Sequence, residues 1–262
     1  MAGEQAVRTL VIIPTFNERD SLPTAIARTR RAVPQADILV VDDNSPDGTG
    51  AIADAAAADD DAVHVLHRPG KAGLGRAYIA GFGWALERSY ELVVEMDADG
   101  SHRPEQLVDL LDRARRADAP DLVIGSRWVP GGAVVNWPKH RELLSRGANT
   151  YVRVLLGLPV RDSTAGFRVF RASTLAALPL AEVESQGYGF QVDMTWRVHR
   201  SGGRIAEVPI SFVERAEGRS KMSREIITEA LTRTTVWGLR HRARQLAALG
   251  RQLPARGRRR PR

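Results

Sequence analysis

Five short apolar runs recur along the first half of the chain, and each is followed by a polar turn. Because the runs are continuous rather than alternating, they are typical of buried parallel strands. They cover residues 9–14, 38–41, 63–66, 92–96 and 122–125. The stretches after the first four runs predict helices over about residues 21–32, 49–58, 74–87 and 104–116, with Ser21 as an N-cap and Pro104 in a first turn. This alternation predicts an α/β fold with a mainly parallel central sheet flanked by helices.

The regular alternation stops after Arg127. The following segment is rich in Gly, Pro and Trp and predicts a helix only at about residues 145–156. Two further strands are predicted at residues 167–170 and 204–213, with a helix near 190–199 between them. We find no internal repeat and no linker before about residue 218. We therefore expect one domain over residues 1–218, a basic lid and a moderately amphipathic helix over 219–250, and a disordered Arg-rich tail over 251–262.

Polar clusters follow the strands at residues 14–18, 42–47, 97–102 and 126–127. Ligands of such sheets bind outside the carboxyl ends of the strands, so the four clusters predict one shared site. Asp97 and Asp99 are one residue apart after a strand, where both carboxylates can lean into one crevice. Hard cations such as Mg²⁺ or Mn²⁺ take one or two carboxylates and fill their other positions with phosphate oxygens and water. The pair predicts a metal–diphosphate site, with an ordinary surface turn as the alternative.

Two common nucleotide-binding motifs are absent from the sequence. A dinucleotide fingerprint needs Gly-x-Gly-x-x-Gly after the first strand, and residues 14–18 contain no glycine. Gly73 and Gly75 match in part, but Tyr78 stands at the third position. Lys71 follows a glycine without the upstream glycine or the following Ser or Thr of a phosphate-binding P-loop. The sequence therefore disfavours both a dehydrogenase and a P-loop enzyme.

Charge is unevenly distributed along the 262 residues, whose net charge is +7. Residues 219–262 carry 13 Lys and Arg against two acids, so the remaining body is mildly acidic. We expect the basic segment to contact anionic lipid or a membrane protein subunit, with a solubility tail as the alternative. We expect no nucleic-acid partner for the body; nucleic acid stays open for the tail alone. With no cysteine, no apolar signal-peptide core and no run of about 18 apolar residues, we expect a cytoplasmic protein, peripheral on the membrane.

Several motifs follow one another along the chain: Pro-Thr-Phe-Asn-Glu at 14–18, Val-Val-Asp-Asp-Asn-Ser-Pro-Asp-Gly-Thr at 40–49, Met-Asp-Ala-Asp at 96–99, Gly-Ser-Arg at 125–127, Asn-Trp-Pro at 136–138 followed by Arg141, Asp-Ser-Thr-Ala-Gly-Phe at 162–167, and Arg215 with Gly-Arg-Ser-Lys-Met-Ser at 218–223. In this order they resemble the inverting family 2 glycosyltransferases. Within them the chain is most similar to the polyprenol-phosphate (dolichol-phosphate) mannose synthases, over roughly residues 8–223. Phe16 stands where Tyr is common and Ser101 where some members have Gln, and some relatives carry C-terminal transmembrane helices.

The resemblance implies a GT-A fold, a divalent metal (Mg²⁺ or Mn²⁺) and roles for individual residues. Asp97 and Asp99 would hold the metal, with Ser101 in support, and Asp99, Arg127 and Arg141 would be catalytic. Arg215 and Lys221 would bind the donor diphosphate, and Arg127, Arg141 and Ser145 the acceptor phosphate. The predicted base and ribose contacts are Pro14, Phe16, Glu18, Val41, Asp43 and Ala98, and Gln191 and Asp193 are candidates for the sugar pocket. Helix N-capping by Glu18 and Asp43, and a surface salt bridge for Arg141, are the structural alternatives.

The implied reaction transfers mannose from GDP-mannose to the phosphate of a membrane polyprenyl phosphate. A phosphate monoester has a second pKa of about 6, so the acceptor is mostly a dianion at neutral pH and needs no general base. A single displacement with inversion would give a β-linked sugar phosphate and GDP. The alternatives are glucose or another sugar from a UDP donor, and an inactive nucleotide-binding scaffold.

Overall fold

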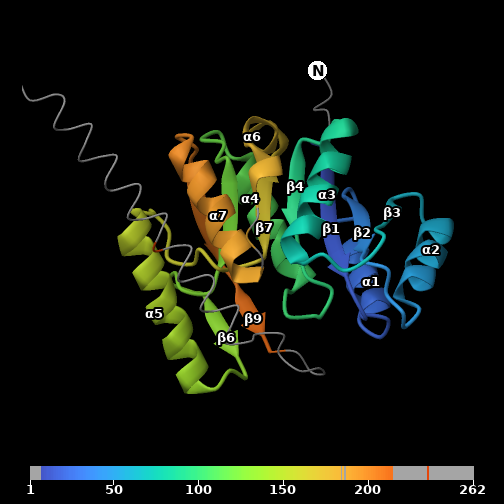
Figure 1. The fold of residues 1–262 in the computed structure, drawn as a ribbon, viewed down its shortest axis with the longest axis horizontal. Helices are drawn as coiled ribbons and strands as arrows, with labels where there is room; N and C mark the ends of the chain where they lie inside the picture. The colour runs from blue at the N-terminus through green and yellow to red at the C-terminus, as the bar shows by residue number, and fades with distance from the viewer. Residues whose placement is uncertain (1–6, 184, 186, 215–234, 236–262) are drawn as a thin grey trace, which may run out of the picture.

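The computed structural model describes residues 7–183, 185, 187–214 and 235 (Figure 1). Seven strands of this part form one sheet. Across the sheet they follow in the order β3 (Val63–His67), β2 (Asp37–Asp42), β1 (Thr9–Thr15), β4 (Leu92–Glu95), β7 (Arg168–Arg171), β5 (Leu122–Ser126) and β8 (Ile205–Pro209). All neighbours pair in parallel except β7, which is antiparallel to both β4 and β5. The predicted, mainly parallel sheet is therefore confirmed.

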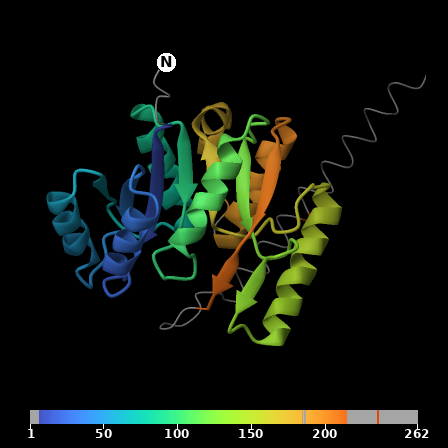
Figure 2. The same cartoon turned by 180° about the vertical axis from the view of Figure 1, so that it is seen from behind.

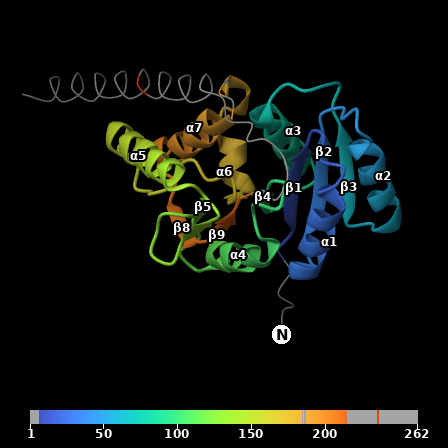
Figure 3. The ribbon, with the colours of Figure 1, turned by 90° about the horizontal axis from the view of Figure 1, so that it is seen from below.

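Helices cover both faces of the sheet, which gives three layers (Figure 3). Helices α3 (Leu74–Glu87), α6 (Ala172–Ala177) and α7 (Gly187–Arg200) cover one face. Helices α1 (Leu22–Ala32), α2 (Thr49–Asp59) and α4 (Leu107–Arg115) belong to the other, which Figure 2 shows from behind. Residues of β1 alternate between the two cores: Leu10 and Ile12 face the first, Val11 and Ile13 the second. Two buried faces explain why the strands are apolar at every position.

A second sheet of two parallel strands, β6 (Ala133–Val135) and β9 (Ser211–Val213), extends from the carboxyl edge of the main sheet (Figure 1). The prediction of one strand over residues 204–213 was wrong. The chain leaves the main sheet at Pro209, which has no N–H to continue a ladder. Ile210 then joins the two sheets, because its N–H donates to the carbonyl of Ser126 and its carbonyl accepts from Ala133.

Helix α5 (Lys139–Leu156) begins six residues before the predicted start at Ser145. Pro138 directly precedes it, as is common where a helix begins. The helix predicted from Pro104 opens with a 3-10 turn, η1 (Pro104–Gln106), and a second such turn, η2 (Leu180–Glu182), precedes α7. Ser21 makes no capping bond to the α1 backbone; its hydroxyl donates to Glu18 instead.

The predicted C-terminal helix over residues 223–249 and the tail lie outside the described residues, apart from Thr235. Among the helices that the structure does describe, none combines the length and the apolar character needed to cross a membrane.

Candidate active site

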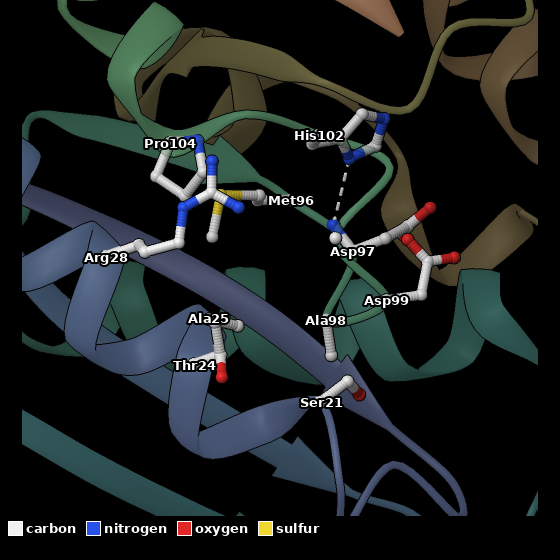
Figure 4. Close-up of a pocket in the computed structure, with 11 residues that line it drawn as sticks. Ser21, Thr24, Ala25, Arg28, Met96, Asp97, Ala98, Asp99, His102 and Pro104 are labelled. Carbon is white, nitrogen blue, oxygen red and sulfur yellow. Dashed lines mark hydrogen bonds between the residues drawn. The ribbon is translucent and has the colours of Figure 1, made fainter. Parts of the chain in front are cut away.

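Asp97 and Asp99 lie in the turn that follows β4, and Figure 4 shows their carboxylates turned toward each other. The backbone N–H of Asp97 donates to Nδ1 of His102 (3.1 Å), and the N–H of Ser101 donates to Oδ1 of Asp99 (2.9 Å). His102 is itself stacked on Phe167, with the ring centroids 5.1 Å apart. These contacts hold the turn in a shape that brings two carboxylates together beside an open pocket.

The two carboxylates fit a divalent cation that takes most of its ligands from substrate and water. No cluster of three or more His, Cys, Asp or Glu suited to a metal occurs in the described part of the chain. A zinc-type cage is thus not formed by these residues, whereas Mg²⁺ or Mn²⁺ needs only one or two carboxylates. Gly166 lies beside them, since a Cβ there would be in ordinary contact with Oδ2 of Asp97 (3.9 Å) and Nε2 of Gln191 (3.7 Å).

Tyr78, on α3, holds one of the two aspartates by a hydrogen bond. Its hydroxyl donates to Oδ1 of Asp97 (3.3 Å), and its side chain is fully buried. Burial raises the pKa of Tyr78 well above its usual value, and the charge of Asp97 raises it further. The phenol therefore keeps its proton and acts as a permanent hydrogen-bond donor to Asp97.

A buried ion pair lies under the same turn. Arg168 on β7 faces Glu95 on β4 at 4.0 Å, and both side chains are fully buried. The Arg168 guanidinium donates to the carbonyls of Ser163 (2.7 Å), Ala165 (2.6 Å) and Gln191 (2.9 Å). Arg168 thereby ties the 162–167 loop to α7 and to the end of β4. Burial lowers the pKa of Arg168 to about 10, with Glu95 opposing the change.

Glu95 makes folding stability depend on pH. Burial raises its pKa from 4.5 to about 7, against the opposing charge of Arg168. A raised folded-state pKa means that the folded protein binds the proton more tightly, so stability is highest below the unfolded pKa and falls as the pH rises through about 7. At about 1.4 kcal/mol per pH unit between the two pKa values, the loss amounts to about 3 kcal/mol.

Glu95→Gln is therefore expected to match the wild type in thermal stability near pH 5 and to exceed it by several degrees at pH 8. Thermal melts of both proteins in metal-free buffer at the two pH values measure this. A difference in melting temperature that stays constant across this range would contradict the raised pKa.

The predicted nucleotide contacts gather at the ends of β1 and β2. Pro14 and Val41 are paired in register, and Val41 is fully buried. Asp43, also buried, forms an ion pair with Arg68. Burial raises the pKa of Asp43, while Arg68 opposes the change. Asp43 caps no helix, so the N-capping alternative is wrong for this residue.

Two more predicted contacts are Glu18, shortly before α1, and Ala98, in the turn after β4. Glu18 accepts a hydrogen bond from the Ser21 hydroxyl (2.9 Å), and its backbone carbonyl accepts from the N–H of Leu22 at the start of α1. Ala98 is buried and lines the same pocket as Ser21 and Asp99. Of the predicted nucleotide contacts, Ala98 lines this pocket together with Asp97 and Asp99. The others lie at the ends of β1 and β2 and in the segment before α1, and the shared site stays a prediction.

Asp42, the neighbour of Asp43, has a structural role. Its carboxylate accepts from the hydroxyls of Thr15 (2.9 Å) and Ser45 (2.6 Å), and from the N–H of Ser45 (3.0 Å). These bonds join the end of β1 to the turn after β2. Asp42 is thereby held inside the protein, and its buried neighbour Asp43 instead pairs with Arg68.

Sequence reasoning missed Arg68 and Lys71, which lie in the loop between β3 and α3. The Nζ of Lys71 is 4.3 Å from the ring centroid of Phe16, and Arg68 contacts Asp43. The available signal was the position of this cationic Gly-rich loop, at the carboxyl end of a parallel strand, where ligands of such sheets bind.

Arg127 is buried in an ion pair. Its Nε and Nη2 donate to the two carboxylate oxygens of Asp162, both at 2.7 Å, and its backbone N–H donates to Asp162 as well. Burial alone would raise the pKa of Asp162, but the charge and hydrogen bonds of Arg127 lower it below its usual value. Thr164 accepts from Arg127 and from Asn149 of α5, so the pair connects β5, the 162–167 loop and α5.

Arg141, at the start of α5, lies in an aromatic surrounding. Its guanidinium carbon is 4.1 Å from the ring centroid of Trp137, and its Nη1 contacts Glu214 at 2.6 Å. The salt-bridge alternative thus describes one of its contacts. The buried Nε of Arg141 and the indole N–H groups of Trp128 and Trp137 have no hydrogen-bond partner among the described residues. These three hydrogen-bond donors are available to an anionic ligand.

The remaining predicted site residues are found on α5, near the aspartates, on α7, or outside the described part of the chain. Ser145 lies on α5 one turn after Arg141, and its carbonyl accepts from Asn149. Ser101 and Gln191 are buried near the aspartates, whereas Asp193 is engaged by Ser185 (3.0 Å) and Arg197 (2.8 Å). Arg215 and Lys221 lie outside the described residues.

Comparison with known proteins shows which relatives the chain resembles. The chain is 59% identical over 242 residues to the undecaprenyl-phosphate mannosyltransferase of Micrococcus luteus, covering 92% of this chain and 98% of the relative. It is 58% identical over 236 residues to the polyprenol monophosphomannose synthase of Mycolicibacterium smegmatis, covering 90% and 88%. Glucosyl-3-phosphoglycerate synthase of Mycobacterium tuberculosis, solved with Mn²⁺, UDP-glucose and phosphoglyceric acid, shares the fold with a TM-score of 0.64 at 21% identity, covering 87% of this chain and 80% of that one.

Residues 10–178 match glycosyl transferase family 2. This match spans most of the main sheet and includes Asp97, Asp99, Arg127 and Arg141. The chain therefore belongs to glycosyl transferase family 2, and it is a glycosyltransferase with a GT-A fold.

Proposed function

We propose that the protein transfers mannose from GDP-mannose to the phosphate of a polyprenyl monophosphate, with inversion, to give polyprenyl β-mannosyl phosphate and GDP. The observation that carries the proposal is the facing pair Asp97 and Asp99, placed at the same sheet edge as the cationic residues that follow β5. The names of the two relatives that are 58–59% identical, a mannosyltransferase and a monophosphomannose synthase, support mannose as the sugar and a polyprenyl phosphate as the acceptor.

Each group of residues has a separate task in this reaction. Asp97 and Asp99 would hold Mg²⁺ or Mn²⁺, which neutralises the leaving diphosphate when bound. Pro14, Phe16, Glu18, Val41, Asp43 and Ala98 would bind the nucleoside. Arg141, assisted by Ser145, would hold the acceptor phosphate in line with the sugar carbon. Ser101 would support the metal site, and Gln191 would contact the sugar. Arg215 and Lys221 stay proposed for the donor diphosphate.

We also propose a revised role for Arg127. Because its guanidinium binds Asp162 through two hydrogen bonds in a buried place, we assign it the positioning of the 162–167 loop and α5. Arg141 then carries the phosphate contact from the start of the same helix. Asp193 accepts a hydrogen bond from Arg197 on the same helix, α7. It would therefore position Gln191 and α7 beside the sugar without touching the sugar itself.

The test is a transfer assay with labelled GDP-mannose, UDP-glucose and GDP-glucose, a short polyprenyl phosphate, and Mg²⁺ or Mn²⁺. We expect lipid labelling from GDP-mannose only, abolished by chelator. Labelling from UDP-glucose instead would overturn the donor but keep the reaction type. No labelling from any donor by a folded protein would favour the scaffold alternative.

The proposed acceptor requires contact with a membrane, and α5 offers a suitable surface. Of the large apolar side chains that are exposed in the described residues, four lie on α5: Leu143, Leu144, Tyr151 and Val154. Arg146 and Arg153 flank them on the same helix and are exposed. An apolar stripe beside cations is typical of helices that lie in the surface of an anionic bilayer. We propose peripheral binding at the cytoplasmic face through α5 and the basic C-terminal segment.

The double variant Leu143→Ser and Val154→Ser is expected to bind vesicles of anionic phospholipid at least about fivefold more weakly than the wild type, because two apolar side chains leave the bilayer. Val108→Ser, which removes an exposed valine from α4, is the matched control. Co-sedimentation over a range of lipid concentrations measures the affinities. Equal binding by both variants and the wild type would exclude α5 as the contact.

A further inference from the structure

Strand β9 connects the turn that carries the two aspartates with the segment that leads into α5 (Figure 1). It pairs in parallel with β6, which comes shortly before α5 in the chain. Two of its backbone N–H groups donate to the segment that follows the aspartates: that of Val213 to the carbonyl of Ser101 (3.1 Å), and that of Ser211 to Oε1 of Gln106 (3.2 Å). A displacement of β9 would therefore change how these two parts of the chain lie relative to each other.

The side chain of Phe212, at the centre of β9, contacts three residues that come from three different loops. Its ring meets the ring of His102 edge-on, with centroids 5.5 Å apart, and the indole of Trp137 edge-on at 5.6 Å. The guanidinium carbon of Arg127 lies 5.4 Å from the centroid of the same ring. Edge-to-face rings and a cation near a ring are favourable at these separations. Phe212 thus joins the loops that follow β4, β5 and β6.

Two of these three contacts lead directly to residues of the proposed site. On one side, Nδ1 of His102 accepts the hydrogen bond from the backbone N–H of Asp97 (3.1 Å). On the other side, the indole of Trp137 carries the guanidinium of Arg141, whose carbon lies 4.1 Å from the ring centroid. Only one side chain therefore separates Phe212 from Asp97, and only one separates it from Arg141.

We propose that Phe212 is a positioning residue, which fixes the metal turn and Arg141 relative to each other so that the donor sugar and the acceptor phosphate lie in line. This inference rests on the proposed function, in which Asp97 holds the metal and Arg141 the acceptor phosphate. In-line displacement depends steeply on geometry, and a misplacement of about 1 Å can cost about 10²-fold in rate. A flat, rigid ring between two other rings restricts their relative positions, whereas a leucine of smaller size would leave them free to shift.

The test measures sugar transfer from GDP-mannose to a short polyprenyl phosphate by the full chain with Mn²⁺, and GDP binding by calorimetry with Mn²⁺. Phe212→Leu removes the ring and keeps an apolar side chain on β9. We expect its kcat to fall about tenfold, because the two reactants are no longer held in line. Its affinity for GDP should change less than about twofold, since the hydrogen bonds of His102 and Ser101 within the metal turn remain. Phe212→Tyr, which keeps the ring, should retain at least about half of the wild-type kcat.

Trp84→Leu is the matched control, because it removes another half-buried ring from a cluster of the same kind. Trp84 lies 5.0 Å from the ring of His64 and 5.9 Å from that of Tyr90, which precedes β4 at the end of the sheet opposite to the aspartates. This variant should keep kcat within about twofold of the wild type, even where its melting temperature falls as far as that of Phe212→Leu.

A double-mutant cycle separates positioning from a general loss of structure. Arg141→Lys keeps the charge and lowers kcat by itself. Combined with Phe212→Leu, it should lower kcat by clearly less than the product of the two single losses, because both residues act on the same alignment. Losses that simply multiply would mean that Phe212 acts independently of Arg141, and the inference would be wrong.

Three further outcomes decide between the inference and the proposed function. An unchanged kcat in Phe212→Leu, or a loss of GDP affinity as large as the loss of kcat, would overturn the inference. If the wild type used UDP-glucose and not GDP-mannose, and Phe212→Leu lowered kcat with UDP-glucose but not UDP affinity, the proposed donor would fail while the inference stood. No transfer by the wild type from either donor would overturn both.

Discussion

Asp162→Ala is expected to lower the free energy of unfolding by about 3–5 kcal/mol, which is the cost of leaving one member of a buried ion pair without its partner. The Asp162 side chain is fully buried and that of Arg127 is 4% exposed, so water cannot replace the lost carboxylate. Because the pKa of Asp162 is lowered in the folded state, this stabilisation is present above the unfolded pKa and is lost as the pH falls through the folded value.

Urea unfolding at pH 7, above both pKa values of Asp162, measures this effect. Asp118→Ala is the control, since Asp118 pairs with Arg113 by hydrogen bonds of similar length on the surface. Removal of that pair should change stability far less than removal of the buried one. Arg127→Met combined with Asp162→Leu should recover much of the loss, because no buried charge remains unpaired. A change of less than about 1 kcal/mol for Asp162→Ala would contradict the assigned role of the pair.

Asp97→Asn is expected to reduce sugar transfer by about 10²–10³-fold, since a metal contributes several kcal/mol to neutralising a leaving diphosphate. The substitution keeps the size of the side chain and its acceptor for Tyr78, so the turn after β4 should persist. Turnover of labelled donor under saturating substrate measures the rate. Mn²⁺ affinity in the presence of nucleotide gives a second readout that does not depend on the acceptor.

Asp109→Asn is the control for Asp97→Asn, because Asp109 is an exposed carboxylate on α4. It should retain wild-type turnover and Mn²⁺ affinity. If Asp97→Asn kept full activity, or lost activity without any change in Mn²⁺ affinity, the metal role of Asp97 would be wrong.

The sequence predicts the features that depend on neighbouring residues. The apolar runs identify β1 to β5, and the Asp-Ala-Asp segment identifies the pair that the structure turns together. The position of β7 between β4 and β5 could not be predicted. Residues 167–170 predict a strand, but the residues of a strand do not identify its neighbours in the sheet. The partner of Arg127 is 35 residues away, and a single chain gives no sign that Asp162 would meet it in the core. From the sequence, Lys71 was considered only as part of a P-loop, whose pattern it does not fit. Its contact with Phe16, 55 residues away, forms only when the loop folds.

The insertion of β7 has a consequence for the order in which the chain can fold during synthesis. Strands β1 to β4 can pair as soon as they emerge, but both neighbours of β5, namely β7 and β8, come later in the sequence. A ribosome-bound chain that ends before residue 168 therefore carries β4 with an open edge and β5 with no partner. Exposed strand edges recruit other chains, so this interval is when the nascent protein is most exposed to aggregation and to capture by chaperones.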